Sequence, residues 1–177
     1  MAITRLNNNS LTSITALPSG VGGLAMADMF RLTATINSDR DPITSNLERV
    51  DDASFSKIGA GMTLSSGIYT FPSTGLYEIS VNAAFQISQD LVGNLETMVS
   101  SNSGGSYDQV AAAVGGDQSS SFMMATSCSV CFVNVTNIST FRVKFTTTSF
   151  ASTDSRVTGS TDANETTFTF IKLAESQ

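Results

Sequence analysis

Acidic side chains are the first candidates for chemistry in this sequence. Asp39 and Asp41 flank Arg40, and Asp51 is followed directly by Asp52. Paired carboxylates can act as general acid and base in glycoside hydrolysis, or they can bind Ca²⁺. Glycoside hydrolysis requires two carboxylates at a defined distance across a cleft, and Ca²⁺ binding requires further oxygen ligands. The sequence identifies neither a cleft nor the additional ligands. We therefore interpret these acids as solvated surface residues and predict no catalytic residue, no metal ligand and no cofactor.

Histidine and cysteine chemistry is also limited. The chain contains no His, which excludes His-activated nucleophiles and His metal ligands. Cys128 and Cys131 form a C-x-x-C pair, and a redox pair of this kind requires a helix N-terminus that lowers one thiol pKa. The surrounding segment is instead predicted as a strand, on which residues three apart point to opposite faces. We predict two small apolar core residues that do not bridge.

The composition excludes several classes of protein. A net charge of −6 and a pI near 4.4 argue against a nucleic-acid partner, because a nucleic-acid binder carries a basic patch. A mean hydropathy of +0.10 without charge runs argues against disorder. No apolar stretch approaches the roughly 18 residues of a membrane-spanning helix, so no membrane partner is expected. Polar residues interrupt the N-terminal apolar residues, and we predict no secretory signal.

Strand periodicity dominates from residue 29 onward. In the clearest segment, residues 67–87, a turn at 72–75 is followed by strict alternation that predicts a hairpin with one face on the core. Further strands are predicted over residues 29–36, 95–99, 110–114, 122–135, 141–145 and 166–173, with 110–114 bounded by Gly115 and Gly116. Eight or more short strands without a long helix predict an all-β fold, a two-sheet antiparallel sandwich.

An uncharged segment precedes the strands. Residues 6–27 carry no charge, and residues 18–23 form a flexible Gly-rich break. We divide the chain into an extended N-terminal anchoring arm with a Gly-rich hinge, residues 1–23, and a β domain, residues 24–177. The apolar residues expected to anchor the arm on a partner are Ile3, Leu6, Leu11, Ile14 and Leu17. The alternative is a loose terminal tail.

Two predicted strands, 122–135 and 166–173, carry apolar residues on both faces. A strand of a soluble monomeric sandwich should leave one face polar. Residues 58–141 also lack Lys and Arg, and charge depletion is typical of a subunit interface. These features predict an oligomer, and the alternative is a monomer with a third layer or a lid.

One sequence phrase suggests a family. The run Gly67-Ile68-Tyr69-Thr70-Phe71-Pro72-Ser73-Thr74-Gly75-Leu76-Tyr77 resembles the G-x-Y-x-F/C-P-x-x-G-x-Y pattern of C1q/TNF-like jelly rolls. The segment 167–173 resembles the closing strand of that family. The resemblance implies a ten-strand jelly-roll sandwich and a compact homotrimer. The residues expected in its trimer interface or core are Tyr69, Phe71, Tyr77, Phe168, Phe170, Ile171 and Leu173.

The N-terminus suggests a context. Residues 3–11 together with 15–18 resemble the N-terminal segment of virion structural proteins from tailed bacteriophages, marine ones especially. The chain departs from secreted C1q proteins because it lacks a signal peptide and a collagen-like G-x-y stalk. The resemblance implies a virion protein that is assembled in the host bacterial cytoplasm. Its expected partner is the major capsid protein or another virion protein.

Together these features predict a non-enzymatic phage structural protein, a trimeric capsid decoration or cement protein docked through its arm. Such a protein stabilises the assembled shell by mass action, and three arms act together through effective concentration. The alternative is the receptor- or glycan-binding tip of a tail fibre or head spike. In that case loops 100–105 and 149–161, with Tyr107, would contact a host surface glycan or protein. An enzyme is disfavoured by the absence of His and of any catalytic motif.

Overall fold

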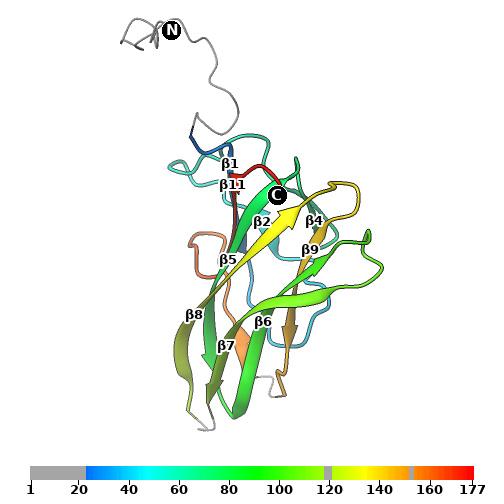
Figure 1. The fold of residues 1–177 in the computed structure, drawn as a ribbon. Helices are drawn as coiled ribbons and strands as arrows, with labels where there is room; N and C mark the ends of the chain where they lie inside the picture. The colour runs from blue at the N-terminus through cyan, green and yellow to red at the C-terminus, as the bar shows by residue number, and fades with distance from the viewer. Residues whose placement is uncertain (1–22, 118–120, 152–153) are drawn as a thin grey trace, which may run out of the picture.

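The computed structural model describes residues 23–117, 121–151 and 154–177, which form a β sandwich (Figure 1). No helix in these residues is long and apolar enough to cross a membrane. The strands are β1 (Met26–Leu32), β2 (Leu47–Arg49), β3 (Thr63–Ser65), β4 (Ile68–Thr70), β5 (Gly75–Ile87), β6 (Asp90–Ser100), β7 (Asp108–Asp117), β8 (Met123–Val135), β9 (Arg142–Thr148), β10 (Arg156–Val157) and β11 (Thr167–Ala174).

Two antiparallel sheets make up the sandwich. In sheet A, β8 pairs with one edge of β5, and β11 and β10 share its other edge, followed by β1 and β2. In sheet B the order is β3, β4, β9, β6 and β7. The predicted all-β, two-sheet antiparallel sandwich is therefore confirmed.

The long strand β5 shows how the sequence builds the core. Its odd-numbered side chains, from Tyr77 to Ile87, are buried, and its even-numbered side chains are half-buried on the outer face, as the alternation predicts. Aromatic rings from both sheets meet in the interior. The ring of Tyr69 lies 5.0 Å from that of Phe30 and 5.5 Å from that of Phe145, both edge-on. Such edge-to-face packing adds stabilisation beyond burial of apolar area.

The predicted hairpin at residues 67–87 is wrong. β4 pairs with β3 and β9 in sheet B, whereas β5 belongs to sheet A, so the turn at 72–75 carries the chain from one sheet to the other. Phe71 and Tyr77 flank this crossover with ring centroids 4.8 Å apart. Alternation identifies the inward face of each strand but does not identify the strand that it pairs with.

The first strand also differs from its prediction. β1 begins at Met26 rather than Met29 and ends at Leu32, so Ala34 lies outside it and is exposed. Arg31, expected on the polar side of the alternation, is only 2% exposed. It is buried because three carboxylates from the following segment, those of Glu48, Asp51 and Asp52, surround its guanidinium.

The glycines predicted to end the seventh strand lie inside it. Gly115 pairs with Gly93 of β6, and β7 continues to Asp117. A Cβ atom on Gly115 would lie 2.9 Å from the ring of Phe85, and one on Gly93 would lie 2.1 Å from the ring of Phe150. Gly115 and its partner Gly93 therefore make room for aromatic rings, and Gly115 does not end the strand.

Candidate interaction surface

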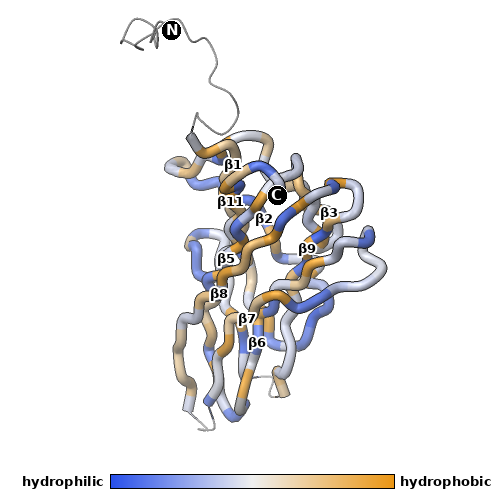
Figure 2. Tube along the Cα trace, viewed as in Figure 1, coloured by the Kyte–Doolittle hydropathy of each residue, from blue (hydrophilic) through white to orange (hydrophobic). Residues whose placement is uncertain are grey.

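The outer face of β8 carries exposed apolar side chains. Its odd-numbered residues turn inward, with Val133 and Val135 in the core. Its even-numbered residues turn to solvent, and Met124 is 67%, Val130 55% and Phe132 64% exposed. Figure 2 shows hydrophobic colouring along this strand. Large apolar residues gathered on one exposed strand mark an interaction site more often than isolated ones do.

The closing strand β11 extends this surface across sheet A. Phe168 and Phe170 point into the core, whereas Ile171 is half-buried on the outer side and Leu173 is 47% exposed. Ile171 lies opposite Glu78 of β5, which in turn lies opposite Phe132 of β8, so the three form one row across the sheet. We call this surface the apolar face, and its residues are Met124, Val130, Phe132, Ile171 and Leu173.

Charge is scarce on the strands that carry the apolar face, although Arg156 of β10 lies in one row with Gln86 and Met124. The charged residues of β5, β8 and β11 are Glu78 and Lys172. Lys172 is 8% exposed and pairs with Glu175, which leaves Glu78 as the charge that these strands present on the outside. The far edge of β8 has no ladder partner among the described residues, although the Val114 N–H of β7 donates a hydrogen bond to Ser127 Oγ of β8 at 3.1 Å. A long uncharged edge strand promotes association unless another chain or element covers it.

The residues predicted for the trimer interface or core divide clearly by position. Tyr69, Phe71, Tyr77, Phe168 and Phe170 are buried within the protomer's own core, whereas Ile171 and Leu173 belong to the apolar face. The interface set omits the most exposed apolar residues, Met124, Val130 and Phe132. The signal for them was present, because residues 122–135 were predicted to be apolar on both faces.

The two cysteines lie on opposite faces of β8, as the strand period requires. Cys128 is exposed, contrary to the predicted core position, and its Sγ lies 3.1 Å from the Asn82 Oδ1 acceptor. Cys131 is half-buried against the core, and burial raises the pKa of its thiol. A raised pKa is the opposite of what a reactive thiolate requires.

Asp39, Asp41 and Asp51 are exposed and Asp52 is half-buried, and each of these acids also bonds to another part of the chain. Asp39 accepts a hydrogen bond from the Phe150 backbone N–H at 3.0 Å, and Asp41 pairs with Lys144. The carboxylates of Asp51 and Asp52 contact Arg31, at 2.8 and 3.0 Å. In the part of the chain that the structure describes, no group of three or more His, Cys, Asp or Glu residues is placed to hold a metal ion.

A further buried charge was not expected from the sequence. The Asp28 carboxylate accepts hydrogen bonds from Arg49 Nε and Nη2 at 2.8 and 3.0 Å, and from the backbone N–H groups of Met29 and Met62. The nearby Tyr69 hydroxyl has no hydrogen-bond partner within the described residues. Burial, and then the charge of Asp28, raise the pKa of Tyr69 far above its usual value, so its phenol stays neutral. This cluster joins β1, β2 and the segment before β3.

The other predicted contact residues remain untested. The anchoring residues Ile3, Leu6, Leu11, Ile14 and Leu17 lie outside the described residues, as does almost all of the predicted hinge. Loop 100–105 is held by the Ser100 hydroxyl, which accepts hydrogen bonds from backbone N–H groups of the loop. Tyr107 lies with its ring 4.5 Å from Lys144 Nζ. Their contact with a host surface stays a prediction.

Comparisons with known proteins define the fold class. No family model matches the sequence, and no curated protein matches it. Among solved structures, Eiger TNF from S. frugiperda superposes with a TM-score of 0.62 at 13% identity, covering 88% of this chain and 96% of that one. Murine APRIL, crystallised at pH 5.0, gives 0.57 at 11% identity, covering 84% and 98%. The chain therefore has a TNF-like jelly-roll fold.

Proposed function

We propose that this chain is a non-enzymatic, homotrimeric structural protein of a bacteriophage particle, a decoration protein that docks on the capsid through residues 1–23. The apolar face beside the unpaired edge of β8 carries the proposal, because a protomer alone leaves Phe132 and Val130 in water. The TNF-like fold supports the trimeric state, and the phage-like N-terminal sequence supports the place in a virion.

The position of the apolar face suits a ring of subunits. β8 lies at the edge of sheet A, whereas β11 lies within the sheet on the other side of β5. A contact in which the β8 edge of one protomer covers the β11 region of the next uses two different surfaces of each subunit. Such a contact closes into a ring when the rotation between subunits fits. Burial of an exposed Phe or Leu side chain contributes about 1.5–3 kcal/mol.

The position at which the chain enters the β domain would allow the N-terminal segments of all three subunits to dock on the same surface. Gly23 and Ala25 line a small hollow together with Leu173, so the chain enters the domain next to the apolar face. In Figure 1 the start of β1 and the end of β11 lie at the same end of the sandwich. In a ring the three N-terminal segments therefore leave from one end. Three weak arms that engage one lattice together bind far more tightly than one arm.

Copy number in purified particles tests this function. We expect a copy number comparable with that of the major shell protein, measured by quantitative mass spectrometry. Deletion of residues 1–22 should abolish incorporation while leaving the isolated trimer intact, and the matched control is the full chain added to the same shells. A few copies per particle would instead favour the tip of a fibre or spike. Absence from particles would contradict both roles.

A further inference from the structure

A second feature lies on the other side of the sandwich, in the connection between β1 and β2. Its Ile36 pairs with Val157 of β10 in sheet A, and its Arg40 pairs with Thr147 of β9 in sheet B. The connection thereby closes the flank between the two sheets and encloses a cavity of about 230 Å³. The residues that line this cavity are Thr35, Ile36, Asn37, Arg40, Ile43, Thr44, Ser45 and Asn46.

The lining of the cavity is mainly hydroxyls and amides. Ile36 and Ile43 are buried and supply a small apolar floor. The other neutral lining residues are exposed Ser, Thr and Asn, whose side chains both donate and accept hydrogen bonds. No carboxylate lines the cavity, so the charge in its wall is that of Arg40.

Arg40 is exposed and lies in the wall of the cavity, where its backbone pairs with β9. The N–H and C=O groups of Arg40 both bond to Thr147, each at 3.0 Å, which makes this stretch locally extended. Thr147 is fully buried, whereas Arg40 lies at the flank of the sandwich and is exposed, so a ligand can reach its side chain from solvent. The neighbours Asp39 and Asp41 point to the opposite face, where Phe150 N–H and Lys144 hold them. Neither acid is therefore available to Arg40.

Arg40 is unusual among the cations of this protein. Nine Lys and Arg residues are present, and Arg5 lies outside the described segments, which leaves eight. Seven of these eight have head groups bonded to carboxylates or backbone carbonyls, namely Arg31, Arg49, Lys57, Arg142, Lys144, Arg156 and Lys172. The guanidinium of Arg40 alone among them has no ion pair, hydrogen bond or ring contact with another described residue. A guanidinium is a fixed fork of donors that matches a carboxylate or phosphate.

We propose that this cavity binds an anionic sugar residue, with Arg40 bonding its carboxylate or phosphate and the Ser, Thr and Asn side chains bonding its hydroxyls. A bare anion would use only the guanidinium, whereas the ring of hydroxyls and amides fits a ligand rich in hydroxyl groups. Ile36 and Ile43 provide an apolar contact for the C–H face of a sugar ring. The cavity is smaller than the roughly 300–1,000 Å³ of pockets for drug-sized ligands, which restricts it to one residue of a longer glycan.

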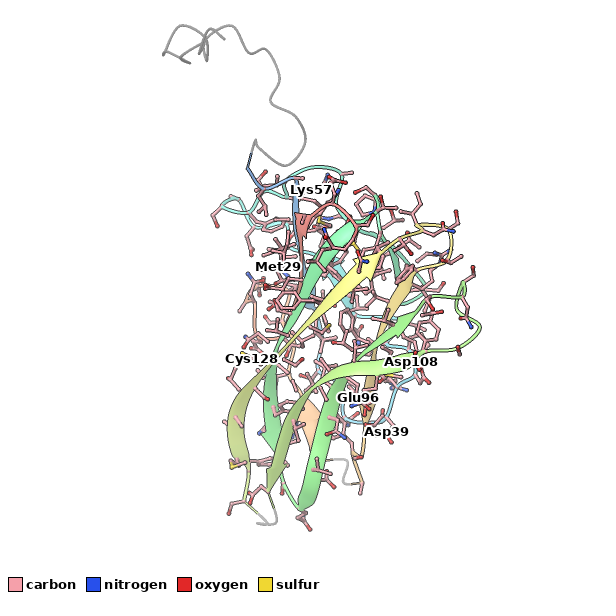
Figure 3. The ribbon with its side chains drawn as sticks, in the orientation of Figure 1. Met29, Asp39, Lys57, Glu96, Asp108 and Cys128 are labelled. Atoms are coloured by element: carbon pink, nitrogen blue, oxygen red, sulfur yellow. The ribbon has the colours of Figure 1, made fainter. Side chains whose placement is uncertain are left out.

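The site is compatible with the proposed trimer but does not depend on it. Cys128 of β8 and Asp39, next to Arg40, lie on opposite flanks of the molecule in Figure 3. Subunit contacts through the apolar face therefore leave the cavity open. The site would let a decorated particle hold an anionic surface glycan, and it would do the same in a fibre tip.

Isothermal titration calorimetry with the full chain tests the site. The probes are methyl glucuronide, glucose 6-phosphate, the neutral methyl glucoside and inorganic phosphate. We expect binding of the glucuronide, the sugar phosphate or both, and the pattern identifies the anion. Arg40→Gln should weaken that binding by about tenfold or more, because a hydrogen bond to a charged group is lost. The matched control is Arg142→Gln, whose guanidinium bonds backbone carbonyls away from the cavity, and it should bind as the wild type does.

A second variant separates sugar recognition from simple anion binding. Thr44→Val removes one lining hydroxyl and keeps Arg40, so it should weaken sugar binding without changing any binding of inorganic phosphate. Equal binding of the neutral glucoside, or inorganic phosphate binding as tightly as the sugar phosphate, would overturn the proposal. Unchanged affinity in Arg40→Gln would also overturn it. The isolated protein is used throughout, so the outcome does not depend on whether the protein is incorporated into particles or on its oligomeric state.

Discussion

Phe132→Asp is expected to convert the proposed trimer into folded monomers. The side chain is 64% exposed in the protomer, so a carboxylate there should leave the protomer fold intact. In the proposed ring the same side chain is covered by a neighbouring subunit, and burial of an unpaired charge costs several kcal/mol. Sedimentation equilibrium at a fixed protein concentration measures the change in mass.

The control for this variant is Ile138→Asp. Ile138 is also an exposed apolar residue, but it lies in the turn between β8 and β9 and outside the apolar face. It should keep the mass of the wild-type protein. If Phe132→Asp also kept that mass, the apolar face would not be the subunit interface. If both variants dissociated, the effect would not be specific to the face.

Asp28→Ala is expected to lower the free energy of unfolding by about 3–5 kcal/mol, the usual range for breaking a buried ion pair. The Asp28 side chain is fully buried and accepts the bidentate fork of Arg49. Its loss also leaves the buried N–H of Met62 without its acceptor. Urea unfolding followed by circular dichroism measures the effect, with equal protomer concentrations because association shifts apparent stability.

An exposed ion pair provides the comparison for Asp28. Asp51 contacts Arg31 at 2.8 Å but is 75% exposed at its side chain, and Glu48 and Asp52 still contact Arg31 when Asp51 is removed. Asp51→Ala should therefore cost less than about 1 kcal/mol. Similar losses of unfolding free energy in the two variants would mean that burial does not set the strength of these ion pairs.

Alternation in the sequence predicts the burial of most strands correctly. β5 shows why, since it alternates strictly and lies with one face on the core, whereas β11 carries apolar residues on both faces. Pairing is harder to predict, because the turn at 72–75 reads equally well as a hairpin and as a crossover between sheets. The role of Gly115 in β7 was mispredicted for a related reason, since it depends on the ring of Phe85, which is distant in sequence.

Charged residues were the least predictable part of the candidate site. Arg31 occupies a polar position in its alternating segment, yet it is buried because three acids from residues 48–52 fold back onto it. Asp28 and Arg40 carry no local signal at all. Asp28 pairs with Arg49, 21 residues away, whereas Arg40 has no side-chain partner among the described residues, and both outcomes follow from how distant segments meet.

The mass of the wild-type protein in solution tests the central claim most directly. One protomer has a mass of 18.6 kDa, so a homotrimer has three times that mass, 55.8 kDa. Sedimentation equilibrium should give the trimer mass across dilution, because the proposed ring covers Met124, Val130 and Phe132, which each protomer alone exposes. A mass of one protomer at every concentration would contradict the account, since the apolar face would then stand open to water.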